Sequence, residues 1–179
     1  MPMISTSFST ERLSICPWHD QNGPLGSFAG LAEFVTHLLS QNVTASLPPS
    51  WQGSYSHARA RSWISQLDTQ ATVLLLSERL RCEPVGIVIL FAEKLSVAAP
   101  ELRIGYLLSE QHWGQGFASE LMVGFVAQCA RDGIGVIRGG VAVDNYASRR
   151  VLERCGFALE EGPTDTAECT YRLDLQALS

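Results

Sequence analysis

Three features are missing from this sequence of 179 residues, and each absence excludes a class of protein. No apolar run approaches the roughly 20 residues that span a bilayer. Lys and Arg number 13 against 18 Asp and Glu, so no positive excess is available to neutralise nucleic-acid phosphates or an anionic membrane. The first residues lack the charged-then-apolar pattern of a signal peptide. The sequence therefore predicts a cytoplasmic protein with no nucleic-acid or membrane partner, whose net charge of −5 suits a cationic partner such as an amine.

The cysteines lack the spacing of a metal or redox site. There are five of them, an odd number, and none forms a Cys-x-x-Cys pair. Scattered thiols of this kind are typical of reduced cytosolic proteins, where cysteine acts as a small buried hydrophobe. We therefore predict free thiols and no metal.

The pattern of apolar residues predicts one mixed α/β domain over residues 1–179. Alternating or short apolar runs predict strands at residues 11–16, 71–77, 84–91, 102–108, 136–143, 157–161 and 168–175. Helical spacing predicts helices at residues 25–39, 55–67, 114–130 and 148–155. The last two strands flank a predicted turn at residues 162–165. Four aromatic residues in the least readable segment are predicted to be core: Phe28, Trp51, Tyr55 and Trp63.

The most informative stretch is Trp113-Gly-Gln-Gly-Phe-Ala118, which joins a predicted strand to a predicted helix. Gly114 and Gly116 allow backbone conformations barred to other residues and a close approach by a ligand. The unpaired N–H groups of a helix start favour an anion, and a pyrophosphate is a suitable one. No Lys-Ser/Thr follows the glycines, and the spacing is not Gly-x-Gly-x-x-Gly, which argues against a P-loop and a Rossmann loop. A tight turn without a ligand stays open on this stretch alone.

Three blocks of the sequence together resemble the GNAT acetyltransferases, in particular their RimJ/RimL-like branch of ribosomal-protein N-acetyltransferases. The first is the glycine loop, which is similar to the family pattern Gln/Arg-x-x-Gly-x-Gly/Ala, with Trp113 at its first place. The second, Asp144-Asn-Tyr-Ala-Ser-Arg-Arg-Val-Leu-Glu-Arg-Cys-Gly-Phe157, is similar to the branch's Asn-x-x-Ser and Gly-Phe motif. The third is Thr10-Glu-Arg-Leu13. The resemblance runs from residue 10 to about 175 and implies a single mixed, mostly antiparallel, twisted sheet flanked by helices, whose splayed central strands hold CoA.

The resemblance also implies roles for individual residues in binding acetyl-CoA. Pantetheine is expected along Leu107 and Leu108, and next to Asn145 and Ser148. Asn and Ser before a helix are also ordinary caps, so both roles stay open for this pair. The pyrophosphate is expected on the loop, where Gly114 makes room beside the residues Trp113, Gln115, Gly116, Phe117, Ala118 and Ser119.

The chemistry implied is direct attack of a neutral amine on the thioester. In many relatives a Tyr four residues before the Gly of Gly-Phe protonates the leaving thiolate, but here that place is Leu152, which leaves Ser148 as the donor. Glu101 is the candidate base, directly or through water, with Glu120 as a weaker alternative. A solvated strand-end carboxylate is an equally open reading of Glu101. His112 is expected to shape the cofactor entrance rather than to act as the base.

The acceptor is the least determined part of this hypothesis. The resemblance implies a protein N-terminal amine, such as that of a ribosomal protein, and an α-amino group of pKa about 8 needs less help to lose a proton than a lysine. A small amine, such as an antibiotic or a polyamine, is the alternative within the same class. A non-catalytic acyl-CoA sensor and a nucleotide-binding module are alternatives from other classes, and a homodimer is left open.

Overall fold

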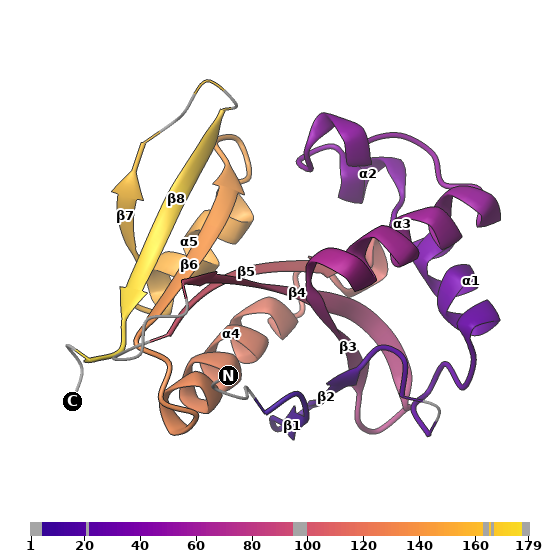
Figure 1. Ribbon diagram of the computed structural model, residues 1–179, viewed down its shortest axis with the longest axis horizontal. Coiled ribbons are helices and arrows are strands. Elements are labelled where there is room, and N and C mark those ends of the chain that lie inside the picture. Colours follow the sequence, from indigo (N-terminus) through magenta and orange to yellow (C-terminus); the bar gives the residue numbers. More distant parts are fainter. Residues whose placement is uncertain (1–4, 21, 95–99, 163–164, 166, 177–179) are drawn as a thin grey trace. The chain divides into compact units, whose positions relative to one another are not determined.

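The protein is described here by a computed structural model covering residues 5–20, 22–94, 100–162, 165 and 167–176. The strands are β1 (Phe8–Ser9), β2 (Leu13–Pro17), β3 (Thr72–Glu78), β4 (Glu83–Lys94), β5 (Glu101–Leu108), β6 (Val136–Ala142), β7 (Ala158–Glu161) and β8 (Glu168–Asp174). The α-helices are α1 (Phe28–Leu38), α2 (Gln41–Thr44), α3 (His57–Gln70), α4 (Phe117–Arg131) and α5 (Tyr146–Arg154). Short 3-10 turns cover Pro49–Trp51 and Glu110–His112. Figure 1 shows the order of these elements along the chain.

Hydrogen bonding orders the strands β1-β2-β3-β4-β5-β6-β8-β7. The pairs β1/β2, β2/β3, β6/β8 and β7/β8 are antiparallel, and β5/β6 is parallel. A parallel pair needs a crossover connection, which α4 supplies between β5 and β6. The predicted fold class, a mixed and mostly antiparallel sheet flanked by helices, is confirmed.

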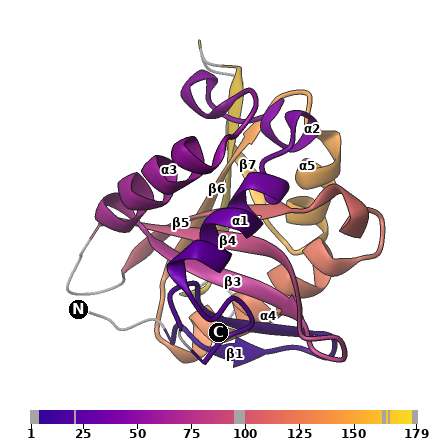
Figure 2. The ribbon, with the colours of Figure 1, turned by 90° about the vertical axis from the view of Figure 1, so that its right-hand side faces the viewer.

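The described chain divides into two compact units, and β4 and β5 each contribute to both. The first, here called the loop unit, holds residues 6–89 and 106–117. In it, α1 and α3 pack against each other and α3 also packs on β3 (Figure 2). The faces that meet are apolar: Leu31 and Val35 of α1 and Ile64 and Leu67 of α3 are almost completely buried.

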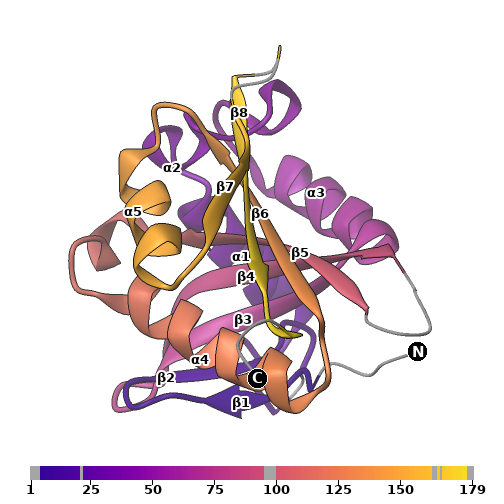
Figure 3. The same cartoon turned by 90° about the vertical axis from the view of Figure 1, so that its left-hand side faces the viewer.

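The second unit, here called the α5 unit, holds the described residues of 1–5, 90–105 and 118–179. Strands β6, β8 and β7 form an antiparallel set, and α5 packs beside it on β6 (Figure 3). Gly139 of β6 makes room for Leu152 of α5, because a Cβ at residue 139 would lie 3.2 Å from the leucine Cδ1. Whether the two units make up one domain over residues 1–179 stays a prediction.

Most predicted elements are confirmed, and the differences occur at their ends. Helix α4 begins at Phe117 rather than at residue 114, because Gly114 and Gly116 adopt left-handed conformations before it. Helix α5 begins at Tyr146 rather than at residue 148, because Asn145 is its N-cap. The sequence did not predict β1 or α2, which at two and four residues are too short to show a period. Residues 163 and 164 of the predicted turn lie outside the described residues.

The prediction of an aromatic core is right for two of four residues. Tyr55 and Trp63 are buried, with 7% and 4% of their surface exposed, and their rings meet edge to face. Trp51 is half-buried and packs edge to face on Trp63. The prediction is wrong for Phe28, which is 37% exposed. Phe28 is the first residue of α1, and its ring stacks on His19 at the surface instead of entering the core.

All five cysteines are free thiols. Cys129 of α4 is fully buried, and burial, aided by the charge of Asp132, raises the pKa of its thiol to about 12. Burial also raises the pKa of Cys16 and Cys155. Because thiolate is the reactive form, these three residues act as small apolar side chains.

Candidate active site

The predicted glycine loop lies between β5 and α4. Gly114 and Gly116 have φ angles of +71° and +83°, in the left-handed region that favours glycine. A Cβ at residue 114 would meet no atom within 4 Å, so the backbone conformation, and not crowding, accounts for glycine there. Gln115 and Gly116 are exposed, whereas Phe117, the first residue of α4, is buried. The loop therefore presents its backbone at the surface directly before a helix start.

The end of β5 departs from regular strand geometry just before the loop. From Glu101 to Ile104 the side chains alternate between half-buried and buried. This alternation is lost over the rest of the strand, where the neighbouring residues Leu107 and Leu108 are both buried. The pairs between β5 and β6 run from Glu101 with Val136 to Ile104 with Gly139, and the end of β5 lies beyond them. On the β4 side, a Cβ at Gly86 would overlap the carbonyl oxygen of Leu107. The two predicted pantetheine residues thus lie where the strand pairing changes.

Trp113 fastens the loop to the strand that precedes it. Its indole Nε1 donates a hydrogen bond of 2.8 Å to the carbonyl oxygen of Leu108, although the side chain is 49% exposed. Gln115 Nε2 donates to the carbonyl oxygen of Gln111 at 2.7 Å. Two side chains of the loop thus bond to the backbone of the strand and the 3-10 turn that precede it, which limits the conformations of the two glycines.

The 3-10 turn before the loop is anchored by a carboxylate. Glu110 accepts hydrogen bonds from the amide of Asn42, at 2.8 Å, and from the hydroxyl of Ser40. These bonds, that of Asn42 above all, hold the pKa of Glu110 below its usual value. His112, the last residue of this turn, is buried, and its ring meets the Phe117 ring edge to face. Its Nδ1 has no hydrogen-bond partner among the described residues. Its side chain supports the loop from within.

The start of α5 separates the two roles that the sequence left open for Asn145 and Ser148. Asn145 is the N-cap, and its Oδ1 accepts from the backbone N–H of Ser148 at 3.1 Å. In the described part of the chain, the Asn145 amide Nδ2 and the Ser148 hydroxyl make no hydrogen bond. Both residues are half-buried. The side-chain oxygen Oδ1 of Asn145 therefore forms the cap, which leaves one polar side-chain group on each residue for a ligand.

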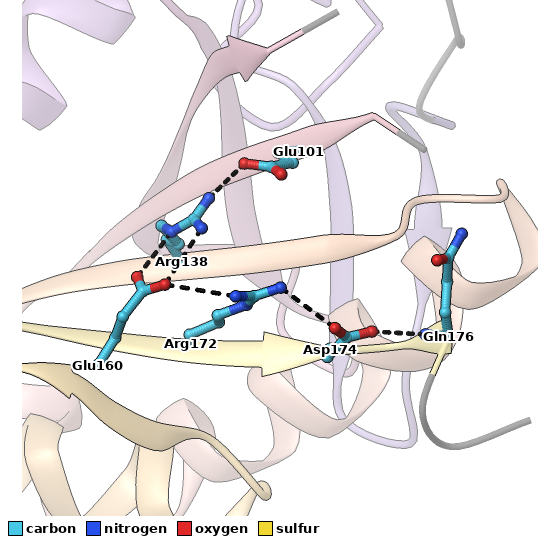
Figure 4. Close-up of polar contacts among 6 residues, drawn as sticks. All are labelled: Glu101, Arg138, Glu160, Arg172, Asp174 and Gln176. Atoms are coloured by element: carbon cyan, nitrogen blue, oxygen red, sulfur yellow. Dashed lines mark hydrogen bonds and ion pairs between the residues drawn. The ribbon is translucent and has the colours of Figure 1, made fainter. Parts of the chain in front are cut away.

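Glu101 belongs to a chain of ion pairs that crosses the strands of the α5 unit (Figure 4). One of its oxygens, Oε2, accepts from the guanidinium of Arg138, whose other nitrogens bind Glu160. The hydrogen bond from Arg138 holds the pKa of Glu160 low, and the pair raises that of Arg138. Arg172 extends the chain from Glu160 to Asp174, which accepts from the backbone of Gln176. In the described residues no hydrogen bond reaches the second oxygen of Glu101, Oε1.

The neighbouring arginines have partners within the α5 unit as well. Arg103, on the same face of β5 as Glu101, pairs with Glu168 across Gly140, where a Cβ would overlap both side chains. Arg149 donates to the hydroxyl of Tyr171 and to a backbone carbonyl of the same unit, each at 3.0 Å. These two guanidinium groups therefore serve the packing of the unit.

The predicted site residues fall into two groups by unit. The loop unit holds Leu107, Leu108 and residues 113–117, whereas Ala118 and Ser119, which follow in the first turn of α4, belong to the α5 unit. The α5 unit holds Glu101, Asn145 and Ser148. Sequence reasoning gave no role to Arg12, whose guanidinium contacts the loop 103 residues away. No local pattern carries that signal, since the contact exists only in the folded chain.

The described residues contain no group of three or more His, Cys, Asp or Glu side chains placed to hold a metal ion. None of the helices described is long and apolar enough to cross a bilayer.

Comparison with known proteins adds a family and a set of similar structures. The family model described as "Acetyltransferase (GNAT) domain" matches residues 23–158. No curated protein matches the chain by sequence. RimL, the ribosomal L7/L12 α-N-protein acetyltransferase in complex with coenzyme A, is similar in structure, with a TM-score of 0.73, 20% identity and 97% and 98% of the two chains covered.

Two further structures show the same likeness. A GNAT acetyltransferase from Bacillus anthracis has a TM-score of 0.74 at 18% identity, over 95% of this chain and 99% of that one. The microcin C7 self-immunity acetyltransferase MccE, in complex with acetyl-CoA and AMP, has a TM-score of 0.69 at 18% identity, over 92% and 93% of the chains. At these identities the likeness shows the fold, and the family match shows the class of protein.

Proposed function

This chain belongs to the GNAT acetyltransferase family and is an N-acetyltransferase, and from that premise we propose that it transfers the acetyl group of acetyl-CoA to a protein N-terminal amine. The observation that carries the proposal is the glycine loop. It places left-handed glycines at residues 114 and 116, exposed backbone at residues 115 and 116, and a helix start at Phe117. GNAT acetyltransferases use acetyl-CoA, and left-handed glycines directly before a helix start support the proposal that this loop takes its pyrophosphate.

In this proposal the pyrophosphate binds to the backbone amides of residues 115–118, and Ser119 lies beside it at the helix start. Amides suit the role, because the first N–H groups of a helix have no partner within it and the helix dipole favours an anion there. Gly114 lets the chain turn, and Trp113 keeps the turn joined to β5 through Leu108.

Pantetheine is proposed to extend along the end of β5, past Leu107 and Leu108. The carbonyl oxygen of Leu107 faces Gly86 of β4, so by the alternation of a strand the backbone N–H of Leu108 faces the other edge. That N–H is our candidate for the group that stabilises the developing oxyanion. The amide Nδ2 of Asn145, which the cap leaves unused, is the candidate donor to a pantetheine carbonyl.

The reaction proposed is direct transfer. The amine nitrogen attacks the thioester carbonyl carbon, the C–S bond breaks, and the acetyl group stays on nitrogen. Holding the two reactants in line accounts for most of the acceleration, roughly 7 to 11 kcal/mol. The thiolate that leaves takes the proton of the Ser148 hydroxyl, which solvent then restores. The hydroxyl suits this role because the backbone N–H of Ser148, and not its side chain, takes part in the cap.

Glu101 is proposed to accept the proton that the amine loses through a chain of waters, because seven residues of extended strand, about 20 Å, separate it from Leu108 on β5. Arg138 holds Oε2 of the carboxylate, which fixes its direction and leaves Oε1 to accept. The demand on this base is small for an α-amino group of pKa about 8, of which roughly a tenth is already neutral at pH 7. It is far larger for a lysine of pKa near 10.4. A weak base of this kind therefore favours an N-terminal amine over a lysine side chain.

A small-molecule amine is the second candidate acceptor. The likeness to RimL favours a protein N-terminus, since that protein is an α-N-acetyltransferase of ribosomal L7/L12. The likeness to MccE, which was solved with acetyl-CoA and AMP, favours a small molecule. The net charge of −5 suits either cationic acceptor.

A thiol-release assay with acetyl-CoA tests the proposal and separates the two acceptors. The panel contains short peptides with free N-termini, the same peptides with blocked N-termini and one internal lysine, and small amines including polyamines. We expect release with free N-termini and none with the blocked peptides. Release with small amines alone would replace the acceptor by the second candidate. Acetyl-CoA binding without release on any amine would favour a sensor.

A further inference from the structure

We propose that Arg12 is a positioning residue for the glycine loop, and that it sets the direction in which the loop's amides face the pyrophosphate. The inference rests on the proposed function, because it takes the loop to be the pyrophosphate site. Arg12 lies just before β2, far from the loop in sequence and next to it in the loop unit.

Two contacts join the Arg12 guanidinium to the loop, and it also lies close to the residue between them. Its Nη1 donates a hydrogen bond of 2.9 Å to the carbonyl oxygen of Gln115. Its Nη2 lies 3.4 Å from the place where a Cβ on Gly116 would stand. Its central carbon lies 4.5 Å from the centre of the Phe117 ring, a cation–π distance. One planar group thus bonds to Gln115, lies beside Gly116 and contacts the ring of the first residue of α4.

The hydrogen bond from Arg12 to the Gln115 carbonyl oxygen fixes the orientation of the whole peptide unit between Gln115 and Gly116. A peptide unit is planar and trans, so the carbonyl oxygen of Gln115 and the N–H of Gly116 point in opposite directions. When Arg12 holds the oxygen, the N–H is directed away from Arg12. Because glycine at φ +83° has few steric restraints of its own, this external contact decides how the amide is aimed. A loop whose amides already face the ligand loses less entropy on binding.

Arg12 is itself held by a bonded turn between β1 and β2. The backbone N–H of Thr10 donates to the Leu13 carbonyl at 2.9 Å, and the Leu13 N–H returns a bond to the Thr10 hydroxyl at 3.1 Å. Arg79 closes the turn from outside, with its backbone N–H on the Arg12 carbonyl and its guanidinium on the Thr10 carbonyl. Leu13 is fully buried and anchors the turn in the core. The turn therefore presents the Arg12 side chain from a fixed backbone.

This arrangement gives the opening block Thr10-Glu-Arg-Leu13 a physical meaning. Thr10 closes the turn, Leu13 anchors it, and Arg12 reaches the loop, while Glu11 is exposed. The block and the glycine loop act as one unit, although 103 residues separate Arg12 from Gln115.

Titration calorimetry on three variants tests the inference, with CoA and with 3′-phospho-ADP, the fragment of CoA that keeps the pyrophosphate. Arg12→Met keeps an apolar stem over Phe117 but removes the donor and the charge. Arg12→Lys restores one donor without the planar group. Arg81→Met is the control, because the Arg81 side chain is 74% exposed on the turn between β3 and β4 and pairs with Glu78 at the end of β3. Melting temperatures show that each variant is folded.

We expect Arg12→Met to raise the Kd of both ligands about tenfold and by the same factor, since the effect acts on the pyrophosphate. Arg12→Lys should recover part of the loss, and the control should match the wild type. In turnover, the KM for acetyl-CoA should rise while kcat is retained. Unchanged Kd values in Arg12→Met, or a loss confined to CoA, would overturn the inference. A wild-type protein that binds neither ligand would instead overturn the proposed function.

Discussion

The glycine loop and the start of α5 contribute to the proposed site in different ways. The loop offers backbone amides, which every residue has, and depends on glycines with positive φ to present them. The start of α5 offers two side-chain groups, the Asn145 amide and the Ser148 hydroxyl, from a regular capped helix. A substitution that changes the backbone conformation should therefore abolish binding by the glycine loop. The contribution of the start of α5 should instead be lost when a single side-chain group is removed.

The difference also explains what holds each part in place. The loop has no regular secondary structure of its own, so contacts from Trp113, Gln115 and Arg12 define it. The start of α5 is defined by hydrogen bonds between near neighbours, from the Ser148 N–H to the Asn145 side chain and from the Arg149 N–H to the Asn145 backbone carbonyl. We expect the loop to be sensitive to substitutions far along the chain, and the helix start to be sensitive only to its own residues.

The largest expected effect comes from a bulky residue in the loop. Gly116→Val should weaken CoA binding at least about a hundredfold, because a β-branched residue is strained at this φ and its side chain occupies the approach of the ligand. Calorimetry measures the Kd. Gly133→Val is the matched control, since Gly133 has a φ of +74° at the end of α4 and shares the strain without the site. Equal loss of CoA binding in both variants would show that strain alone is responsible.

The next effect in size is on turnover. Ser148→Ala should lower kcat about a hundredfold, the low end for general acid catalysis because a thiolate leaves readily, and should leave the Kd of CoA within about twofold. The rate of thiol release at saturating substrate gives kcat, and titration calorimetry gives the Kd of CoA. Helix α5 should keep its stability, because the backbone of Ser148 forms the cap bond. Unchanged kcat in Ser148→Ala would remove the role of proton donor.

Two substitutions at Asn145 separate capping from binding. Asn145→Asp keeps an oxygen that caps the helix but removes the amide donor, so the stability should be retained and the Kd of CoA should rise about tenfold. Asn145→Ala removes both groups and should also lower the unfolding free energy by about 1 kcal/mol. Thermal unfolding and calorimetry measure the two quantities. Wild-type affinity in Asn145→Asp would leave this residue with the cap alone.

The smallest effect is expected at Glu101 and depends on pH. Glu101→Gln should lower the rate on an N-terminal amine at most about tenfold at pH 7 and hardly at pH 9, where an amine of pKa about 8 is already neutral. A pH–rate profile of kcat/KM for wild type and variant measures this. A loss that is the same at both pH values would mean that Glu101 acts only through its ion pair with Arg138.

The sequence predicted the parts of the fold that repeat and the parts that need glycine. Strand alternation in β8 and the helical spacing of α4 found these elements, and the left-handed φ of Gly114 and Gly116 is as the motif required. Phe28 was placed wrongly because hydrophobicity alone does not tell the first residue of a helix from its buried face. Arg12 received no role, and Glu101 no partner, because their contacts join residues 103 and 37 positions apart. Such contacts follow from tertiary packing, which one sequence does not encode locally.

The central claim is that the loop from Trp113 to Ser119 binds the pyrophosphate of acetyl-CoA. Titration of the wild-type protein with acetyl-CoA, ATP and NAD in parallel tests it most directly. The account predicts saturable binding of acetyl-CoA that is tighter than that of either nucleotide. Absence of acetyl-CoA binding, or tighter binding of ATP or NAD, would contradict it and make the loop a structural turn or a nucleotide site.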